Sequence, residues 1–270
     1  MDTQDVLRSP LRWAGSKRKL LPTLQKLAPE KFRRYVEPFC GSLCLYVALK
    51  PPSALVGDIN EELVNFYRMI AWRPQAIACA THELADDEST YYELRGRDPQ
   101  TLNSQERAVR FLYLNRYCFN GVYRTNRQGA FNVARGKHMG SIPPVEELVG
   151  FGRLMRRATV QRCDFEELVD VAKRGDFIYL DPPYAGRGVR DRGEYGMGAF
   201  KEADLDRLAE ALHRASERGV KVLLSYADMP EIRRRFRSWN ATTLDVTRNV
   251  AGFSGARGSV SELILRNFEH

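Results

Sequence analysis

Four consecutive residues, Asp181-Pro182-Pro183-Tyr184, combine a carboxylate, a backbone carbonyl and an aromatic ring directly after the apolar run 177–180. Two prolines hold the backbone extended and remove its N–H donors, so the Asp181 carboxylate and the Pro182 carbonyl act as acceptors. This arrangement suits a planar amino group, with Tyr184 as an aromatic wall beside it. The alternative is a turn that ends a strand and packs its tyrosine on the core.

Three other short segments could hold a ligand. The turn 39–42 contains Gly41, where a cofactor could approach the backbone, but it lacks the G-x-G-x-x-G spacing of dinucleotide folds. Asp58 ends an apolar run, where Rossmann-like folds place a ribose-binding carboxylate, although a helix N-cap is equally compatible with this residue. Segment 12–17 places the Trp13 indole close to the Lys17 cation, and a basic N-terminal arm is the alternative.

Elements that would position these residues alternate along the chain. Apolar runs and helical spacing predict strands at 34–37, 53–58, 158–164, 176–181 and 220–225, helices at 43–49, 61–72, 165–173 and 203–218, and a closing antiparallel pair at 244–247 and 262–266. This order predicts an α/β fold with a Rossmann-like, doubly wound mixed sheet. Because ligands bind at the carboxyl ends of such strands, segment 37–41, Asp58, Asp164 and Asp181 should share one edge.

The alternation stops between about residues 74 and 149. A helix is predicted at 106–119, and the Gly- and Asn-punctuated segment 120–133 resembles a β-hairpin. We therefore expect a catalytic domain formed by 1–60 and 158–270, with residues 61–157 as an inserted, mainly helical recognition domain.

Charge is concentrated in the same region. The chain has 42 basic and 34 acidic residues, a net charge of +8, and 33 of the basic residues are arginine. Arginine suits phosphate and guanine, although a GC-rich genome would also raise its content. Between Gln105 and Gly140 one acid, Glu106, stands against seven bases: Arg107, Arg110, Arg116, Arg124, Arg127, Arg135 and Lys137. This stretch is the candidate polyanion-binding face.

Other classes of protein are disfavoured by composition. With 43% apolar residues, 270 residues can bury a core, and no run approaches the roughly 18 to 20 apolar residues of a membrane helix. The N-terminus, with Asp2 and Asp5, does not resemble a signal peptide. Five cysteines without a C-x-x-C pair suggest neither a disulfide framework nor structural zinc. We expect a cytoplasmic protein that makes no membrane contact.

Taken together, the motifs resemble those of the Dam-like, D12-class DNA adenine N6-methyltransferases of the alpha group. The resemblance spans about residues 12–267 and rests on five motifs in family order: Arg12-Trp13-Ala14-Gly15-Ser16-Lys17, Glu37-Pro38-Phe39-Cys40-Gly41, Asp58-Ile59-Asn60, the segment from Phe119 to Val133, and Asp181-Pro182-Pro183-Tyr184. One departure is Leu43, which stands where the family usually has the second glycine of its turn.

The resemblance implies S-adenosylmethionine as cofactor and no metal. The matching cofactor contacts are Trp13, Lys17, Phe39, Gly41, Asp58, Asp164 and Asp181. Asp58 would serve the ribose, and Asp164 would serve the amino edge of the cofactor adenine.

The implied reaction is methyl transfer to the N6 amino group of adenine in a short double-stranded DNA site, GATC or similar, after the base is flipped. The catalytic residues would be Asp181, Pro182 and Tyr184. The two acceptors would bend the amino group towards tetrahedral geometry, and Tyr184 would stack on the extruded base, so catalysis is positioning plus electrostatics.

For DNA, the resemblance matches Arg124 to a guanine reader and Phe119 to an aromatic beside the gap left by the flipped base. The further expected contacts are Asn120, Asn126, Asn132, Arg116, Arg135 and Lys137. A solvated hairpin that contacts only phosphates is the alternative. After Val133 the family often continues Pro-Phe-Gly, whereas Ala134-Arg135-Gly136 follows here.

Two other functions compete with this one. An RNA or protein-nitrogen methyltransferase could share the Asp181 motif, but it would not be expected to carry the 120–133 segment. A non-catalytic DNA-binding relic is disfavoured because Asp181 and Tyr184 are both intact. The expected partners are double-stranded DNA and a cognate restriction endonuclease, and the expected state is a monomer.

Overall fold

The computed structural model describes residues 7–126, 128–137, 140–184, 200–247 and 259–269. Within them one mixed sheet has the order β3-β2-β1-β4-β5-β7-β6. Its strands are β1 (Tyr35–Glu37), β2 (Ala54–Asp58), β3 (Ala158–Arg162), β4 (Phe177–Leu180), β5 (Lys221–Ala227), β6 (Asn240–Thr247) and β7 (Ser259–Arg266). The first five strands pair in parallel, and β7 pairs antiparallel with β5 and β6. The predicted doubly wound mixed sheet, with its closing antiparallel pair, is confirmed.

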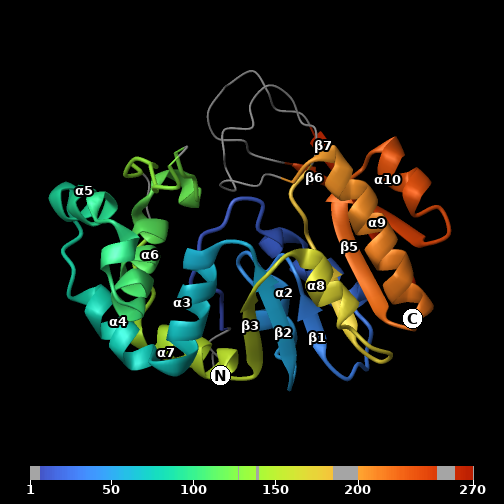
Figure 1. The fold of residues 1–270 in the computed structure, drawn as a ribbon, viewed down its shortest axis with the longest axis horizontal. Coiled ribbons are helices and arrows are strands. Elements are labelled where there is room, and N and C mark those ends of the chain that lie inside the picture. Colours follow the sequence, from blue (N-terminus) through green and yellow to red (C-terminus); the bar gives the residue numbers. More distant parts are fainter. Residues whose placement is uncertain (1–6, 127, 138–139, 185–199, 248–258, 270) are drawn as a thin grey trace, which may run out of the picture.

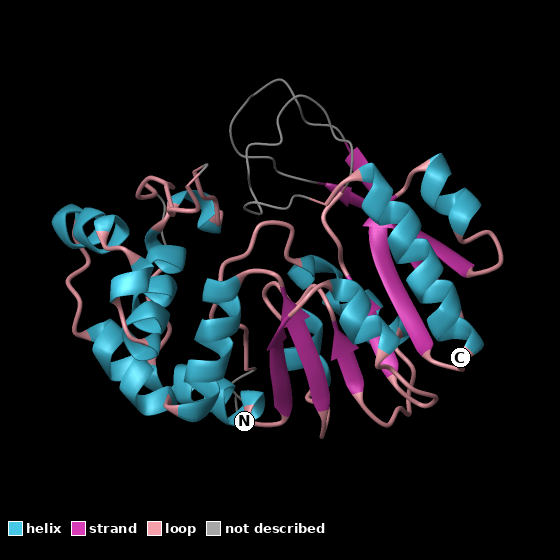
Figure 2. Ribbon diagram, viewed as in Figure 1, coloured by secondary structure: helices cyan, strands magenta, loops and turns pink. Residues whose placement is uncertain are grey.

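Alternating side chains along the strands explain why helices cover both faces of the sheet (Figure 2). Val36 and Ile178 pack with α8 (Phe165–Asp170), α9 (Glu202–Glu217) and α10 (Pro230–Arg235). Their chain neighbours Tyr35 and Phe177 pack in a second cluster with α1 (Leu21–Leu27), α2 (Cys44–Leu49) and α3 (Glu61–Trp72). None of the described helices is both long and apolar enough to span a bilayer.

A group of helices lies to one side of the sheet (Figure 1). It contains α4 (Pro74–His82), α5 (Glu88–Gly96), α6 (Ser104–Tyr117) and α7 (Val145–Met155), together with the short 3-10 helices η2 (Pro99–Thr101) and η3 (Phe119–Gly121). A capping box between Asn103 and Glu106 starts α6 at Ser104, so the helix predicted at 106–119 lies two residues earlier. The structure therefore confirms the mainly helical character of this region.

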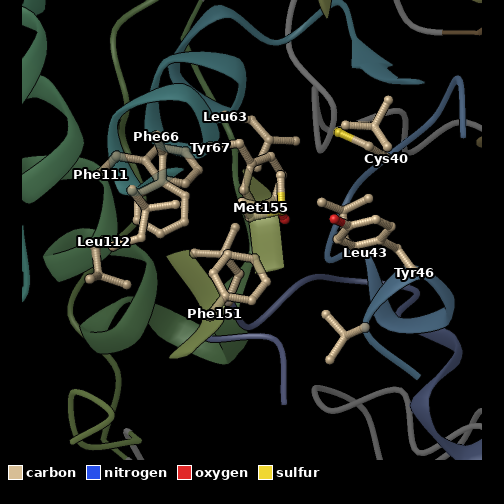
Figure 3. Packing of buried hydrophobic residues seen from close by; sticks show 14 of the residues in the cluster. Cys40, Leu43, Tyr46, Leu63, Phe66, Tyr67, Phe111, Leu112, Phe151 and Met155 are labelled. Carbon is tan, nitrogen blue, oxygen red and sulfur yellow. The ribbon is translucent and has the colours of Figure 1, made fainter. Parts of the chain in front are cut away.

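Aromatic packing joins these helices to α3, which covers one face of the sheet (Figure 3). Phe66 of α3 lies 5.7 Å from Phe111 of α6, and Tyr67 of α3 lies 6.0 Å from Phe151 of α7, measured between ring centroids. All four belong to the same buried cluster as Tyr35. Because the inserted helices and one sheet face share this core, the domain boundaries at 60 and 158 stay a prediction.

The segment after α6 follows the antiparallel course of a hairpin without forming strands. Its pairing consists of two isolated bridges, Cys118 with Arg135 and Thr125 with Phe131. The turn is organised by Asn126, whose side-chain oxygen accepts hydrogen bonds from the backbone N–H groups of Gln128 (2.9 Å) and Ala130 (3.0 Å). The predicted hairpin is thus present as an antiparallel loop without extended strands, held by backbone hydrogen bonds from Phe119 to Ala134 (2.9 Å) and from Gly136 to Tyr117 (2.8 Å) as well as by side chains. We call residues 119–136 the recognition loop.

Candidate active site

Carboxylates from separate strands meet at one edge of the sheet. Glu37, Asp58 and Asp181 lie at the carboxyl ends of β1, β2 and β4. Glu262 reaches the same edge from β7, because antiparallel pairing places it opposite Ala227 at the end of β5. The expected convergence of Asp58 and Asp181 at this edge is confirmed.

A buried ammonium joins two of these carboxylates. Nζ of Lys17 lies 2.7 Å from Oδ1 of Asp181 and 3.2 Å from Oε1 of Glu262. Lys17 is 8% exposed, so it is not part of a solvated arm. Burial alone would lower the pKa of Lys17, but the negative charges of Asp181 and Glu262 outweigh it and raise the pKa above its ordinary value. Lys17 is therefore a fixed positive charge within this acidic edge.

Two contacts orient the side chain of Tyr184, one through its hydroxyl and one through its ring. Its hydroxyl donates to Glu262, with oxygen–oxygen distances of 3.0 and 2.9 Å to the two carboxylate oxygens. The ring packs edge-on against Tyr226, 4.9 Å away between centroids. Tyr184 therefore lies beside Asp181 as part of a polar network, rather than as a simple core residue.

Glu262 is the centre of that network. It is 1% exposed and accepts a 2.7 Å hydrogen bond from Oγ of Ser225 in β5. Burial would raise the pKa of Glu262, but the ammonium of Lys17 and the hydrogen bonds from Ser225 and Tyr184 hold it below its usual range. The group is thus kept ionised in the interior.

Asp58, at the carboxyl end of β2, is held by backbone N–H groups. Its carboxylate accepts backbone hydrogen bonds from Gly41 (3.4 Å) and Asn60 (3.0 Å). Burial raises the pKa of Asp58 to about 6, although these N–H groups oppose the shift. The helix N-cap is Asn60, which accepts from the N–H of Leu63, so the alternative role for Asp58 as that N-cap is excluded.

The turn beside Asp58 is tightly built. Gly41 has φ +42°, and a Cβ there would lie 3.1 Å from the indole of Trp13. Leu43 also adopts a left-handed conformation, with φ 54° and ψ 33°, and its side chain is buried. The residue that departs from the family pattern therefore keeps the backbone conformation that glycine favours.

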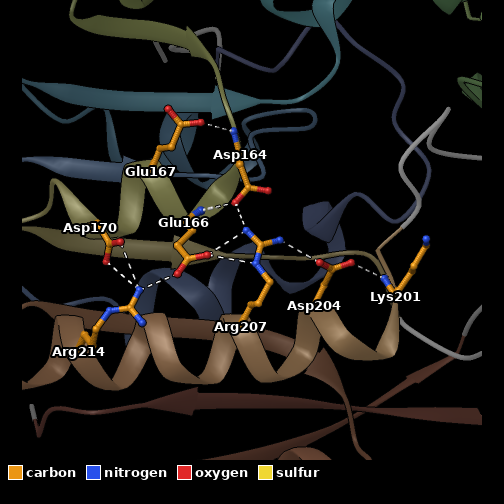
Figure 4. Close-up of polar contacts among 8 residues, drawn as sticks. All are labelled: Asp164, Glu166, Glu167, Asp170, Lys201, Asp204, Arg207 and Arg214. Atoms are coloured by element: carbon orange, nitrogen blue, oxygen red, sulfur yellow. Dashed lines mark hydrogen bonds and ion pairs between the residues drawn. The ribbon is translucent and has the colours of Figure 1, made fainter.

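An aromatic and ionic cluster lies on the α8 side of the edge. Phe39 stacks on Phe165, with ring centroids 5.3 Å apart and planes 24° apart. Asp164 caps α8 and accepts a 2.8 Å hydrogen bond from Arg207 of α9, which also pairs with Glu166 (Figure 4). Asp164 thus already has structural partners, and its predicted contact with the cofactor adenine stays a prediction.

The recognition loop presents the residues predicted to read DNA. Nε of Arg124 donates to Oδ1 of Asn132 at 2.8 Å, and the ring of Phe119 is 49% exposed. Asn120 is exposed and left-handed, with φ 54°. Tyr123, next to Arg124, stacks on Trp13 at 6.1 Å with planes 19° apart, so the loop contacts the segment that packs on Gly41.

Two of the basic residues assigned to the candidate polyanion-binding face contact other parts of the protein instead. The prediction that the whole stretch binds a polyanion is wrong for these two. Arg110 is 4% exposed and donates to the carbonyls of Leu94 and Arg95. Arg107 pairs with Glu61 and Glu62 of α3. Both guanidinium groups therefore bind partners within the protein. Because these partners come from distant segments, a count of charges along one stretch of sequence does not detect them.

Other predicted DNA contacts differ in how they are held. Arg116 donates to the carbonyls of Pro10 (3.0 Å) and Ser141 (2.9 Å), and Arg135 forms an ion pair with Asp86 at 2.5 Å. Lys137 is exposed. Arg116 and Asn126 therefore have clear structural roles, and contact of these residues with DNA stays a prediction.

Comparison with known proteins decides the family. A family model described as D12 class N6 adenine-specific DNA methyltransferase matches residues 13–250. The chain belongs to this family. A type II methyltransferase of Lactococcus lactis subsp. cremoris, M1.LlaDCHI, is 32% identical over 272 residues, covering 97% of this chain and 96% of that one. The retron Ec67 DNA adenine methylase of Escherichia coli is 34% identical, covering 94% and 89% of the two chains. A DNA adenine methylase of Vibrio cholerae serotype O1 is 32% identical, covering 95% of each.

Sequence reasoning missed two site residues of this D12-class methyltransferase, Ser225 and Glu262. Both lie in strands that were predicted, but neither carries a local motif. Their meeting depends on β7 lying antiparallel against β5, where Ser225 pairs with Ile264 and Ala227 with Glu262. The available signal was an acidic residue in an otherwise apolar strand, Ser261-Glu262-Leu263-Ile264-Leu265.

Proposed function

We propose that this D12-class enzyme transfers a methyl group from S-adenosylmethionine to the N6 amino group of an adenine flipped out of a short duplex DNA site. The observation that supports this most directly is the position of Asp181. Its side chain is 22% exposed at the end of β4, beside the anchored ring of Tyr184. A partly exposed acceptor next to a fixed aromatic face suits a planar base that carries an amino group.

The residues at the sheet edge suit the cofactor. Asp181 and Glu262 contact the buried ammonium of Lys17, and Asp58 lies at the same sheet edge, so ionisable carboxylates exceed the positive charge here and favour a cationic ligand. Burial holds the pKa of Glu37 well above its ordinary value, so Glu37 adds no charge to this balance. Asp58 would hold the ribose hydroxyls, with Trp13, Phe39 and Gly41 beside it. When bound, the cofactor supplies a methyl group activated by its sulfonium.

Chain residues then prepare the amino group. The Asp181 carboxylate and the Pro182 carbonyl would accept hydrogen bonds from the two N6 hydrogens, which withdraws the nitrogen lone pair from the ring and directs it. Tyr184 would stack on the base, because its hydrogen bond to Glu262 and its packing against Tyr226 fix the orientation of its ring. We call Asp181, Pro182 and Tyr184 the clamp.

Site selection would belong to the recognition loop, within an insertion bounded at residues 61 and 157. Arg124 is oriented by Asn132 through Nε, which leaves the terminal nitrogens of its guanidinium to face a guanine. Phe119 would occupy the gap left by the flipped adenine. The GATC site that the family resemblance implies stays a prediction, as do the endonuclease partner and the monomeric state.

The test is methyl transfer from S-adenosylmethionine to unmethylated duplex DNA, with structured RNA and a protein mixture as parallel substrates, followed by base-resolved mapping of modified adenine. The proposal expects modification of DNA alone, at one short motif. Methylation of RNA or protein without methylation of duplex DNA would overturn it. Flipping is tested separately by 2-aminopurine at the target position, whose fluorescence should rise on binding.

A further inference from the structure

The strongest feature that the proposed reaction leaves unused is the buried carboxylate of Glu262. It is 1% exposed, and within the described part of the chain it contacts donors on Ser225 at 2.7 Å, Tyr184 at 2.9 Å and Lys17 at 3.2 Å. A carboxylate in the interior is costly unless it is paired and hydrogen-bonded, so a site that keeps one charged requires these partners. Of these donors, Lys17 also pairs with Asp181, and Tyr184 belongs to the same clamp as Asp181.

Lys17 lies between two carboxylates, and the nearer one belongs to the clamp. The Nζ–Oδ1 distance to Asp181 is 2.7 Å, against 3.2 Å to Glu262. An adenine amino group that donates to Oδ1 of Asp181 would compete with the ammonium for that oxygen. An ammonium has three donors and can serve both carboxylates at once.

Glu262 lowers the free-energy cost of moving the Lys17 ammonium away from Asp181. A buried ammonium that lost its only nearby carboxylate would be left uncompensated, which is strongly unfavourable. Because Glu262 lies beside it, the Lys17 ammonium can shift from Asp181 towards Glu262 and remain ion-paired. The same carboxylate also holds the hydroxyl of Tyr184, so the two clamp side chains are coordinated through one group.

We propose that Glu262 is a positioning residue of the adenine clamp: it receives the Lys17 ammonium when Asp181 engages the target amino group, and it fixes the ring of Tyr184 for stacking. The inference rests on the proposed function, because it takes Asp181 as the acceptor for the amino group. Glu262 itself need not touch the base or the cofactor.

The test compares Glu262→Gln with Glu262→Asp. Gln keeps the shape and hydrogen-bonding length but removes the charge, whereas Asp keeps the charge and shortens the reach. A positioning role through the Lys17 charge expects kcat to fall about 10- to 100-fold in Glu262→Gln, with the KM for S-adenosylmethionine and the Kd for duplex DNA unchanged. Glu262→Asp should retain more activity than Glu262→Gln.

A purely structural role gives the opposite order, because the isosteric Gln disturbs packing less than Asp. Wild-type kcat in Glu262→Gln, or higher activity in Glu262→Gln than in Glu262→Asp, would overturn the proposal. If Glu262→Gln does not fold, Ser225→Ala replaces it, with an expected fall in kcat of about 2- to 10-fold. Wild-type kcat in Ser225→Ala would then overturn the proposal.

Asp176→Asn is the matched control. Asp176 is another fully buried carboxylate, paired with Arg33 at 3.0 Å and Arg34 at 2.8 Å, but it precedes β4 and lies at the opposite end of that strand from Asp181. Asp176→Asn should lower the melting temperature and leave kcat unchanged. Asp181→Ala distinguishes failure of the proposed function from failure of the Glu262 proposal. If Asp181→Ala stays active, the assignment of Asp181 to the clamp is wrong. If Asp181→Ala is inactive and Glu262→Gln is fully active, only the role of Glu262 is overturned.

Discussion

The ammonium of Lys17 lies 2.7 Å from a carboxylate oxygen of Asp181, linking a motif near the N-terminus to the first residue of the clamp. This ion pair neutralises part of the acidic edge before any ligand is present. It also explains how a lysine can be 8% exposed and remain charged, since Asp181 and Glu262 compensate its burial.

Lys17→Met should destabilise the protein by about 3–5 kcal/mol at pH 7, because it removes the positive charge that contacts the carboxylates of Asp181 and Glu262. The pKa of Glu262 is now held low by Lys17, so its contribution to stability is present above its unfolded pKa and lost as pH falls. Without Lys17, burial raises the pKa of Glu262, so the contribution of Glu262 to stability is instead lost as pH rises. Thermal unfolding at pH 7 and pH 5 should therefore show a smaller deficit at pH 5. Lys19→Met, at an exposed neighbouring position, is the control.

Asp58 should make the unliganded protein less stable as pH rises. Its pKa in the fold is about 6, above that of the unfolded chain, so its contribution is most favourable below pH 4 and is lost as pH rises to 6. Asp58→Asn should accordingly raise the free energy of unfolding at pH 7 by about 1–3 kcal/mol while weakening cofactor binding. Calorimetric titration with S-adenosylmethionine should show wild-type affinity falling below pH 6. An equal pH dependence in Asp58→Asn would contradict the assignment.

Substitutions at Leu43 test whether the left-handed backbone is strained at this position, where the family usually has glycine. Leu43→Gly relieves a left-handed conformation but removes a buried side chain, and the second effect is larger, so we expect a net loss of about 2–4 kcal/mol. Leu43→Ala loses the same packing and keeps the strain. Denaturant unfolding should find Leu43→Gly at least as stable as Leu43→Ala, the reverse of the usual order at helix positions. A more stable Leu43→Ala would argue against strain at this turn.

Arg124 tests sequence reading. Arg124→Ala should cost about 1–3 kcal/mol in binding the cognate site and relax discrimination at one guanine. Asn132→Ala should relax the same base pair to a smaller extent, because it releases only the Nε hydrogen bond. Binding to a library of single-base variants measures both effects. Lys137→Ala, at an exposed position, provides the comparison, and a uniform loss across all sequences in Arg124→Ala would show a phosphate contact instead.

Much of this fold could be predicted because local patterns determine it. The apolar strand 177–180 and the turn that follows placed Asp181 at a strand end, and the same reasoning placed Asp58. Capping by Asn60, rather than Asp58, depends on the exact helix start, which composition does not specify. The antiparallel course of the recognition loop was predicted, but the side-chain hydrogen bonds of Asn126 and Asn132 that supplement its short backbone pairing were not.

Contacts between distant segments were less accessible from the sequence. Arg107 and Arg110 were counted as surface charge, whereas Arg107 pairs with Glu61 and Glu62, and Arg110 donates to two backbone carbonyls of α5. Glu262 carries no motif and gains its role only when β7 lies antiparallel to β5. Such groups depend on strand order and tertiary packing, which one sequence does not reveal.

Asp181→Ala tests the central claim most directly. Wild type and variant are incubated with S-adenosylmethionine and unmethylated duplex DNA, and modified adenines are mapped at base resolution beside a DNA-binding titration. We predict N6-methyladenine in one short motif for the wild type, and almost none for Asp181→Ala at nearly unchanged DNA affinity. Methylation by Asp181→Ala at close to the wild-type rate would contradict the clamp, and no adenine methylation by the folded wild type would contradict the proposed reaction.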